Sequence, residues 1–401
     1  MENLYIARQP IYDRQLKVIG YELLYRDSDT DRAVFSDGDL ASSQAILNSF
    51  LHIGIDNLTG SALVFINLPE GFITKEALTP MFREQCVLEV LENVEPTEEV
   101  IAGVKRLKEL GFKIALDDFE YQDKFRPLMK LADFIKVDVL GKDKRQLTRE
   151  VTFLRAMSVK LIAEKVETQE MKQLCEELGF DYFQGYFFCR PQTLTHRNVA
   201  ANKAVVLNLI AKLQQDDTSL EEVERILAQD VALSYKLLRY INSAAFSLRR
   251  EVESIKDAII LLGLDNVRNW LTLIVMTRLD KSKPRELIVV AMIRARMCEL
   301  LAQDSHPEFS RQMFIIGLFS VLDALMDQPM IDLLDTVILS TPIKLALLEH
   351  AGPQGAVLNT VLAYERMDSQ RLAESEFEPQ VISSAYFEAV KWADQSLHML
   401  I

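Results

Sequence analysis

The first half of the chain alternates between short apolar runs and longer segments in which apolar residues recur with helical spacing. The short runs have the length of buried β-strands. The longer segments have capping residues at their starts and glycine at their ends, as in residues 97–111 and 168–179. Strands and helices in this order form parallel β/α units, and the number of units predicts a closed, TIM-like barrel. The predicted strands are residues 4–11, 18–24, 63–67, 87–91, 113–118, 134–139, 160–164 and 181–186.

The pattern changes to helical spacing alone after Pro191. Because a chain of 401 residues is too long for one ordinary core, we expect two domains. A polar connection near residues 192–202 separates them, so we place the barrel at 1–195 and an all-α domain at 200–401. Other expected helices are residues 40–54 in the first domain and, in the second, a helix that begins near Ser219 and the segments 230–240, 254–262, 265–276, 286–303, 312–327, 330–334 and 342–401.

Polar residues end most of the predicted strands. The strand over 113–118 stops on the adjacent acids Asp117 and Asp118, which repel each other unless a cation or a ligand uses them. An alternative for this pair alone is a polar turn in which Asp118 caps the next helix. The repetition favours a site, because the carboxyl ends of barrel strands meet at the active-site face. Five further predicted strands have a polar residue at or near their carboxyl ends, namely Glu22, Asn67, Glu89, Asp138 and Glu164, and Lys136 lies in the same strand as Asp138.

Composition narrows the class of protein. No apolar run approaches the roughly 18 residues needed to cross a membrane, and the first residues lack a signal-peptide pattern, so we expect a cytoplasmic protein. The net charge is −14 and no basic block is present, which argues against a nucleic-acid polymer as partner. The four cysteines and five histidines are scattered, so neither a zinc site nor a disulfide framework is expected.

A set of short motifs resembles the EAL domain, a family of cyclic di-GMP phosphodiesterases. The motifs lie in the family's order at the predicted strand ends, and the resemblance covers residues 4–192. They are Gln9-Pro10-Ile11, Glu22-Leu23-Leu24-Tyr25-Arg26, Asn67, Glu89-Val90-Leu91-Glu92, Asp117-Asp118-Phe119, Lys136-Val137-Asp138, Ala163-Glu164-Lys165-Val166-Glu167 and Gln184-Gly185-Tyr186.

This resemblance implies hydrolysis of cyclic di-GMP at a site with two divalent ions, which supply a hydroxide and neutralise phosphate oxygens. Mg²⁺ or Mn²⁺ is implied, because both ions prefer carboxylate and amide oxygens. Lys136 would orient the attacking water. The structural alternative for Lys136 and for Arg26 is an ion pair with an acid that closes the barrel mouth. The implied metal ligands are Glu22, Asn67, Glu89, Asp117, Asp118 and Glu164; the implied catalytic residues are Lys136, Glu22 and Glu167; the implied ligand-binding residues are Gln9, Arg26 and Gln184.

The sequence also departs from this family. Members that hydrolyse well have a glycine-rich loop after the two aspartates, whereas here the loop from Glu120 to Lys124 is shorter and has no glycine. Leucine replaces alanine at Leu23 and threonine at Leu91. Lys165 replaces a glycine and places a cation beside the predicted metals. These changes support ligand binding more strongly than fast turnover.

The second half resembles an HDOD domain, a helical relative of the HD phosphohydrolases that lacks their catalytic ligands. The resemblance covers residues 200–401 and is most specific over 230–246 and 254–263. Where an HD enzyme has adjacent His and Asp, this chain has Gly317-Leu-Phe-Ser-Val-Leu322. Without histidine to bind a metal, catalysis in this half is not expected.

Two hypotheses follow. In the first, the barrel binds cyclic di-GMP with divalent metal and hydrolyses it to the linear dinucleotide, while the helical half makes regulatory contacts with a protein partner. In the second, the barrel is an inactive receptor or adaptor that works through protein contacts. A homodimer is compatible with either hypothesis.

Overall fold

The computed structural model describes residues 4–27, 62–74, 83–118, 122–189, 201–213, 218–228, 254–276 and 283–400, with a few single positions between them. The chain divides into two compact units. One is Met1–Arg190 with Ala363–Ser383, and the other is Pro191–Leu362 with Ser384–Ile401. The division therefore groups residues 363–383 with the barrel, whereas the sequence places them in the second domain. The helix predicted over 40–54, most of the one predicted over 230–240 and the predicted boundary near residues 195–200 lie outside the described residues.

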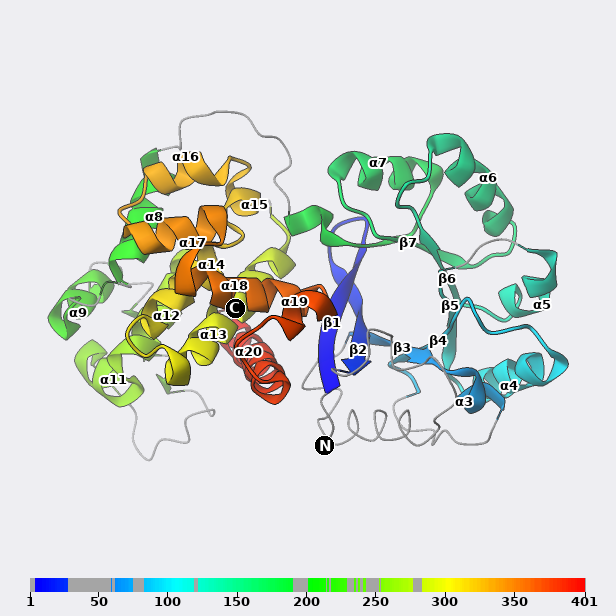
Figure 1. Ribbon diagram of the computed structural model, residues 1–401, viewed down its shortest axis with the longest axis horizontal. Helices are drawn as coiled ribbons and strands as arrows, with labels where there is room; N and C mark the ends of the chain where they lie inside the picture. Colours follow the sequence, from blue (N-terminus) through cyan, green and yellow to red (C-terminus); the bar gives the residue numbers. More distant parts are fainter. Residues whose placement is uncertain are drawn as a thin grey trace. The chain divides into compact units, whose positions relative to one another are not determined.

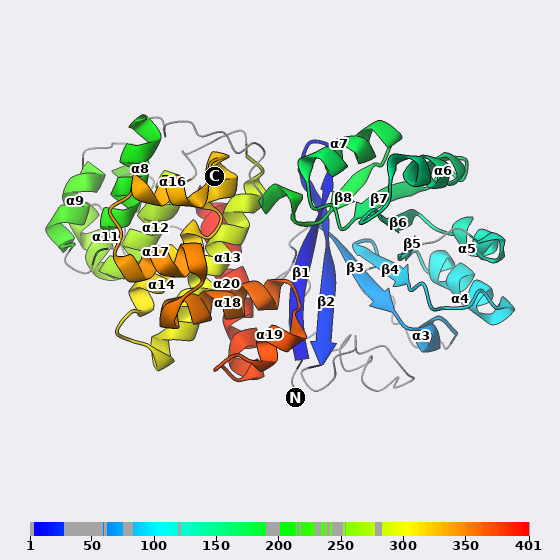
Figure 2. The ribbon, with the colours of Figure 1, turned by 45° about the horizontal axis from the view of Figure 1, so that its top comes forward.

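Eight strands close into a barrel in the order β1 to β8 (Figures 1 and 2). Strands β2 to β8 run parallel to one another, whereas β1 is antiparallel to both of its neighbours, β2 and β8. The reversal follows from the short turn after Asp13, whose carboxylate accepts hydrogen bonds from the backbone N–H groups of Gln15 and Lys17. The strands are β1 Leu4–Asp13, β2 Val18–Asp27, β3 Leu63–Leu68, β4 Cys86–Val90, β5 Lys113–Leu116, β6 Phe134–Asp138, β7 Lys160–Glu164 and β8 Tyr182–Gln184.

Helices α4 to α7 cover the outside of strands β4 to β8 (Figure 2). Local chemistry fixes their ends. Thr97 caps α4, Asp143 and Gln146 form a capping box at α6, and Gly179 ends α7 in the left-handed conformation. The described helices before residue 190 are α3 Glu70–Thr74, α4 Glu98–Glu109, α5 Arg126–Met129, α6 Lys144–Arg155 and α7 Gln169–Leu178, with short 3₁₀ turns at Asp123–Phe125 and Tyr186–Cys189.

The interior of the barrel has an apolar layer directly beneath a polar one. The apolar layer is Ile11, Phe65, Val87, Ala115, Phe134 and Ile162, all buried. Side chains two positions apart on a strand point to the same face. On each of β3 to β7, the residue two positions after the apolar one therefore also points inward, nearer the carboxyl end. These residues are Asn67, Glu89, Asp117, Lys136 and Glu164. On the antiparallel β1 the same level is reached two residues earlier, at Gln9, which lies opposite Glu22 in register.

The second unit is helical. Gly317 lets α14 approach α13 closely, because a Cβ atom there would lie 2.4 Å from the carbonyl oxygen of Arg294. The fold predicted from the sequence, a barrel followed by a helical domain, is confirmed. The helices after the barrel are α8 Ala201–Leu213, α9 Leu220–Ala228, α11 Ile255–Leu262, α12 Leu264–Met276, α13 Arg285–Ser305, α14 Ser310–Phe319, α15 Leu322–Met326, α16 Met330–Asp335, α17 Thr341–Glu349, α18 Gly352–Glu365, α19 Ser369–Ala373 and α20 Pro379–Leu400.

None of the described helices is by itself long and apolar enough to cross a membrane. Helices α11 and α12 reach that length and composition only when taken together, and the pair bends by 112° at Gly263.

Candidate functional site

The polar layer of the barrel contains a lysine surrounded by carboxylates. Lys136 Nζ lies 3.0 Å from Glu22, 2.9 Å from Glu89, 2.8 Å from Asp117 and 2.8 Å from Glu164. We call these five residues the deep cluster. Lys136 and Glu89 are fully buried, so water screens their charges little. The parallel strands bring the five side chains together because each one stands at the same level of the barrel.

A glutamine orients one carboxylate of the deep cluster. Gln184 Nε2 donates to Glu22 Oε2 at 2.6 Å and to Gln9 Oε1 at 2.9 Å. Gly185 follows at φ 144°, and a Cβ atom there would lie 2.1 Å from the carbonyl oxygen of Val166. Only glycine fits this close passage, which holds the end of β8 against the loop after β7.

Burial is the largest influence on the ionisation of this cluster. It raises the pKa of Glu89 and of Glu164 well above the usual 4.5; Lys136 lowers both pKa values, and the neighbouring carboxylates raise them. Burial lowers the pKa of Lys136, but the four carboxylates together outweigh burial and leave that pKa well above 10.5. Lys136 therefore remains an ammonium at neutral pH.

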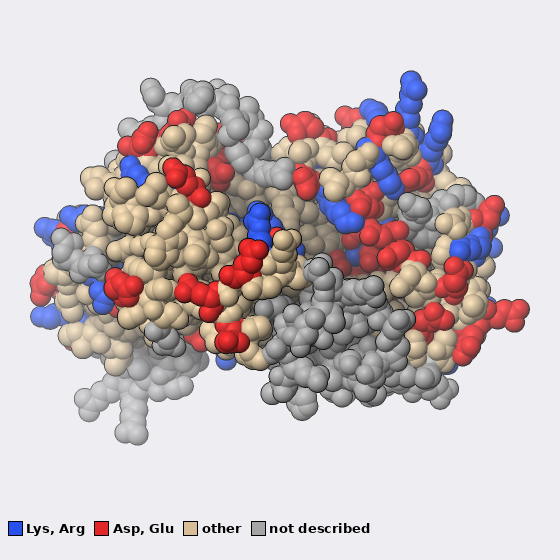
Figure 3. Space-filling view, in the orientation of Figure 1, with Lys and Arg blue, Asp and Glu red and all other residues tan. Residues whose placement is uncertain are grey.

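A second lysine contacts a separate pair of acids nearer the solvent. Lys165 Nζ lies 2.6 Å from Asp138 Oδ2 and 3.4 Å from Asp118 Oδ2. We call these three residues the outer cluster. The side chain of Lys165 is 49% exposed, and its backbone has φ 54°, in the left-handed region that favours glycine. The space-filling view shows Asp and Glu side chains gathered over this part of the barrel (Figure 3).

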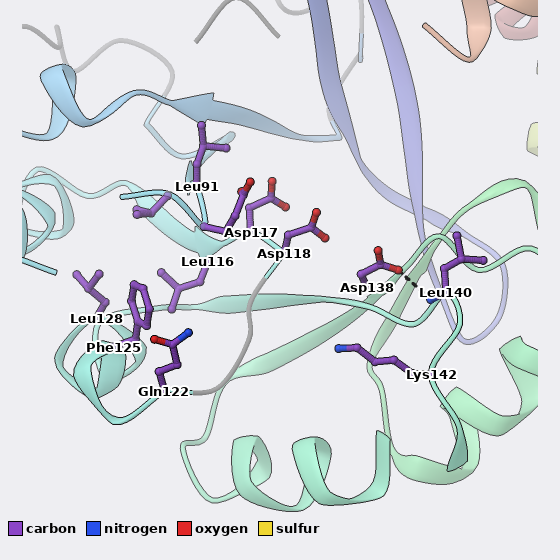
Figure 4. Close-up of a pocket in the computed structure, with 12 residues that line it drawn as sticks. Leu91, Leu116, Asp117, Asp118, Gln122, Phe125, Leu128, Asp138, Leu140 and Lys142 are labelled. Atoms are coloured by element: carbon purple, nitrogen blue, oxygen red, sulfur yellow. Dashed lines mark hydrogen bonds between the residues drawn. The ribbon is translucent and has the colours of Figure 1, made fainter. Parts of the chain in front are cut away.

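A cavity of about 500 Å³ adjoins both clusters. Figure 4 shows its apolar side, formed by Leu91, Leu116, Phe125 and Leu128, and Asp117 and Asp118 beside it. Asp138, Leu140 and Lys142 lie across the cavity, and Gln122 lies near Phe125. The volume of the cavity is within the range of small-molecule sites. A lining of one aromatic and several aliphatic side chains beside charged groups is also typical of such sites.

The donor set of the deep cluster fits a divalent metal ion. Four carboxylates around one ammonium leave a formal charge of −3 when all are ionised, inside a buried layer. Both carboxylate oxygens of Glu89 are buried and make no hydrogen bond, although one is paired with the Lys136 charge. Carboxylate oxygens suit Mg²⁺ and Mn²⁺. With Lys136 in their midst, however, no three acids, histidines or cysteines among the described residues are arranged to hold a metal ion.

The structure brings most of the predicted site residues to one level. Asn67 lies opposite Glu89 in register. Glu167 is exposed in the loop before α7 and lies outside the deep cluster. Arg26 ends β2, but its side chain lies outside the described residues, as do Phe119, Glu120 and Tyr121 of the altered loop.

Two side chains near the site, Gln122 and Phe125, were not predicted from the sequence. Asp138 was predicted as a polar strand end, but not as one of the metal ligands. Gln122 and Phe125 come from a loop and a short 3₁₀ turn, where no periodic pattern marks a residue as facing the cavity.

The structure has a closed barrel with acids at its strand ends, and a helical unit follows it in the chain. Family models agree: the EAL domain model matches residues 73–191, and the HDOD domain model matches residues 200–327. The cyclic di-GMP phosphodiesterase CdgJ of Vibrio cholerae is 33% identical over 409 residues, which cover 100% of this chain and 94% of the relative. The chain belongs to this EAL–HDOD family.

Two further proteins are similar over the whole chain or its first half. Protein YuxH of Bacillus subtilis is 31% identical over 401 residues, which cover 97% of this chain and 98% of YuxH. The calcium and cyclic di-GMP complex of BlrP1 from Klebsiella pneumoniae is 22% identical with a TM-score of 0.39, over 46% of this chain and 55% of that one.

Proposed function

We propose that the barrel is a metal-dependent phosphodiesterase that binds cyclic di-GMP and hydrolyses it to the linear dinucleotide. The observation that carries this proposal is the deep cluster, a buried excess of carboxylates at the strand ends in a chain whose full-length relative is a cyclic di-GMP phosphodiesterase. A buried charge of this size is costly unless a cation offsets it, and hydrolysis of a phosphodiester is a reaction that uses such cations.

Mg²⁺ or Mn²⁺ would be held by Glu22, Asn67, Glu89, Asp117 and Glu164. When bound, the ion supplies a hydroxide at neutral pH and neutralises phosphate oxygens. Lys136 keeps its proton because its pKa is raised, so it donates hydrogen bonds to water or phosphate and does not act as a base. Gln184 holds the Glu22 carboxylate in place through its amide.

The cavity supports a nucleotide as the ligand. Phe125 and the leucines beside it offer an apolar surface to a base, and Gln122 adds an amide that can hydrogen-bond to the edge of a base. Asp117 and Asp118 line the same cavity, so a cation held there would face the phosphates of the bound nucleotide. This combination of an apolar wall and a small number of polar groups matches the general form of a small-molecule site.

The direct test is hydrolysis of cyclic di-GMP by the purified full chain with Mg²⁺ or Mn²⁺, resolved by chromatography. We expect turnover in the native chain and a loss of about a thousand-fold or more in kcat for Glu22→Gln, since a ligand of a catalytic metal contributes several kcal/mol. Glu177→Gln is the matched control. Glu177 lies on α7, is exposed and pairs with Lys144, so this variant should keep native turnover.

A receptor without turnover is the second candidate. Lys136 occupies the position among the acids where a cation would lie, and Lys165 pairs with the nearby Asp138. Titration of cyclic di-GMP in Ca²⁺ separates the two. Binding with turnover supports the enzyme, and binding without turnover supports the receptor. Absence of both would contradict both candidates.

We also propose that the helical half is non-catalytic and makes regulatory protein contacts. Phe319 and Leu322 are fully buried, so the segment from Gly317 to Leu322, where an HD enzyme would have its adjacent His and Asp, is packed as core. Helix α11 exposes Ile260 and Leu261, and exposed apolar side chains that adjoin each other support a protein-binding surface. The identity of that partner, a homodimer and the cytoplasmic location stay predictions.

A further inference from the structure

The acids at the carboxyl ends of β4 to β7 divide between two lysines. The deep cluster contains Lys136, and the outer cluster contains Lys165 with Asp118 and Asp138. Asp117 and Asp118 are adjacent in the chain, yet each contacts a different ammonium group. The structure therefore contains two neighbouring cation positions that share one aspartate pair, which is the arrangement used by sites that bind two metal ions.

The two positions differ in how well a lysine balances the local charge. In the deep cluster one ammonium faces four carboxylates, so a formal charge of −3 is left inside the protein when all four are ionised. In the outer cluster one ammonium faces two carboxylates, and all three side chains are at least 30% exposed. Water can screen the remaining charge of −1 there. A divalent ion would therefore offset more charge in the deep cluster than in the outer one.

The backbone of Lys165 indicates that its position is specific. Lys165 has φ 54°, a conformation that a side chain other than glycine adopts at a cost. Lys165 directly follows Glu164, the last residue of β7, so the strand fixes the position of the Lys165 backbone next to the site. A second divalent ion at Asp118 and Asp138 would have to displace this ammonium or lie against it, and like charges in contact repel each other.

We propose that Lys165 is a tethered cation that takes the place of a second divalent ion, so that this barrel binds one divalent metal ion rather than two. The inference rests on the proposed function only in assuming that the deep cluster holds a metal. Lys165 then supplies a positive charge at the outer position without depending on metal concentration. Its two partners, Asp118 and Asp138, both line the cavity.

The test counts Mn²⁺ ions bound to the full chain, by electron paramagnetic resonance of free Mn²⁺ and by isothermal titration. Lys165→Met removes the ammonium and keeps the length of the side chain, and Lys165→Gly also relieves the positive φ. Lys160→Met is the matched control, because Lys160 lies at the other end of β7, is similarly exposed and pairs with Asp181.

We expect one bound Mn²⁺ in the native chain and in Lys160→Met, and two in both Lys165 variants, with the second ion at least tenfold weaker than the first. Two ions in the native chain, or one ion in both Lys165 variants, would overturn the role of Lys165 while leaving the phosphodiesterase proposal intact. No Mn²⁺ in any of the four proteins would overturn the metal assignment itself, and the inference with it.

Discussion

The deep and outer clusters use the same chemistry, a lysine among carboxylates, in different surroundings. In the deep cluster the Lys136 side chain is 1% exposed and has four acidic partners. In the outer cluster the Lys165 side chain is 49% exposed and has two. An exposed ion pair contributes little to stability, whereas a buried one that loses its partner leaves a costly charge. Burial, rather than the number of acids alone, therefore decides which of the two clusters gains more from the proposed metal ion.

The largest effect is expected from Lys136→Met. Removal of the ammonium leaves the ionised carboxylates of the deep cluster without a counter-charge, so we expect the free energy of unfolding to fall by about 3–5 kcal/mol in EDTA. Mn²⁺ should restore part of the loss, because it can take the vacated position. Chemical denaturation with and without Mn²⁺ measures both quantities. Unchanged stability in EDTA would show that the deep cluster is not the charged centre described above.

Glu89→Gln should separate metal binding from folding. Burial already raises the pKa of Glu89, which favours its neutral form without metal, so the amide should change the stability in EDTA by less than about 1 kcal/mol. The same change removes a charged ligand, and we expect Mn²⁺ affinity to fall about 100-fold. Titration calorimetry gives the affinity. A native affinity in this variant would exclude Glu89 as a ligand.

Affinity for Mn²⁺ should rise with pH. The pKa values of Glu89 and Glu164 are raised in the folded protein, so the stability that their neutral forms provide is present below pH 4.5 and is lost as pH rises through the raised values. Metal binding displaces those protons, and one released proton gives about a tenfold gain in affinity per pH unit. Lys136 does not contribute in this window, because its pKa lies well above 10.5. Titrations between about pH 5 and pH 8 measure the slope, and a flat or falling profile would count against this linkage.

The smallest effect is expected from Lys165→Gly. The lost ion pairs are exposed and contribute about 0–1 kcal/mol, while glycine relieves the positive φ by a similar amount. The free energy of unfolding in EDTA should therefore change by less than about 1 kcal/mol. Thermal or chemical denaturation checks this, and a loss of several kcal/mol would mean that the outer cluster is as important for folding as the deep one.

Much of the barrel could be predicted from the sequence, because its signals are local. A short apolar run marks a strand, and the polar residue at its end marks the site level, as at Asn67 and Glu89. The acids that pair with a lysine cannot be predicted from the residues near it in the sequence. Lys136 of β6 meets all four acids only because the barrel closes, which brings the ends of β2, β4, β5 and β7 to the same level of its interior. The sequence likewise places Lys165 beside the acids but cannot give its φ or its choice of Asp138 and Asp118.

The family motifs did not predict which of their residues lie in the deep cluster and which lie away from it. Glu167 belongs to the same motif as Glu164 and is only three residues away, but the chain has left the strand by that point. Its side chain is exposed, whereas Glu164 is buried against Lys136. Phe125 and Gln122 show the opposite case, since they line the cavity from a segment with no periodic pattern.

The most direct test of a metal-binding deep cluster is anomalous diffraction at the manganese edge from crystals of the full chain grown with Mn²⁺. The account predicts one strong peak among Glu22, Glu89, Asp117 and Glu164, with the Lys136 ammonium displaced from their centre. A map with no peak there, and Lys136 still paired with all four carboxylates, would contradict it.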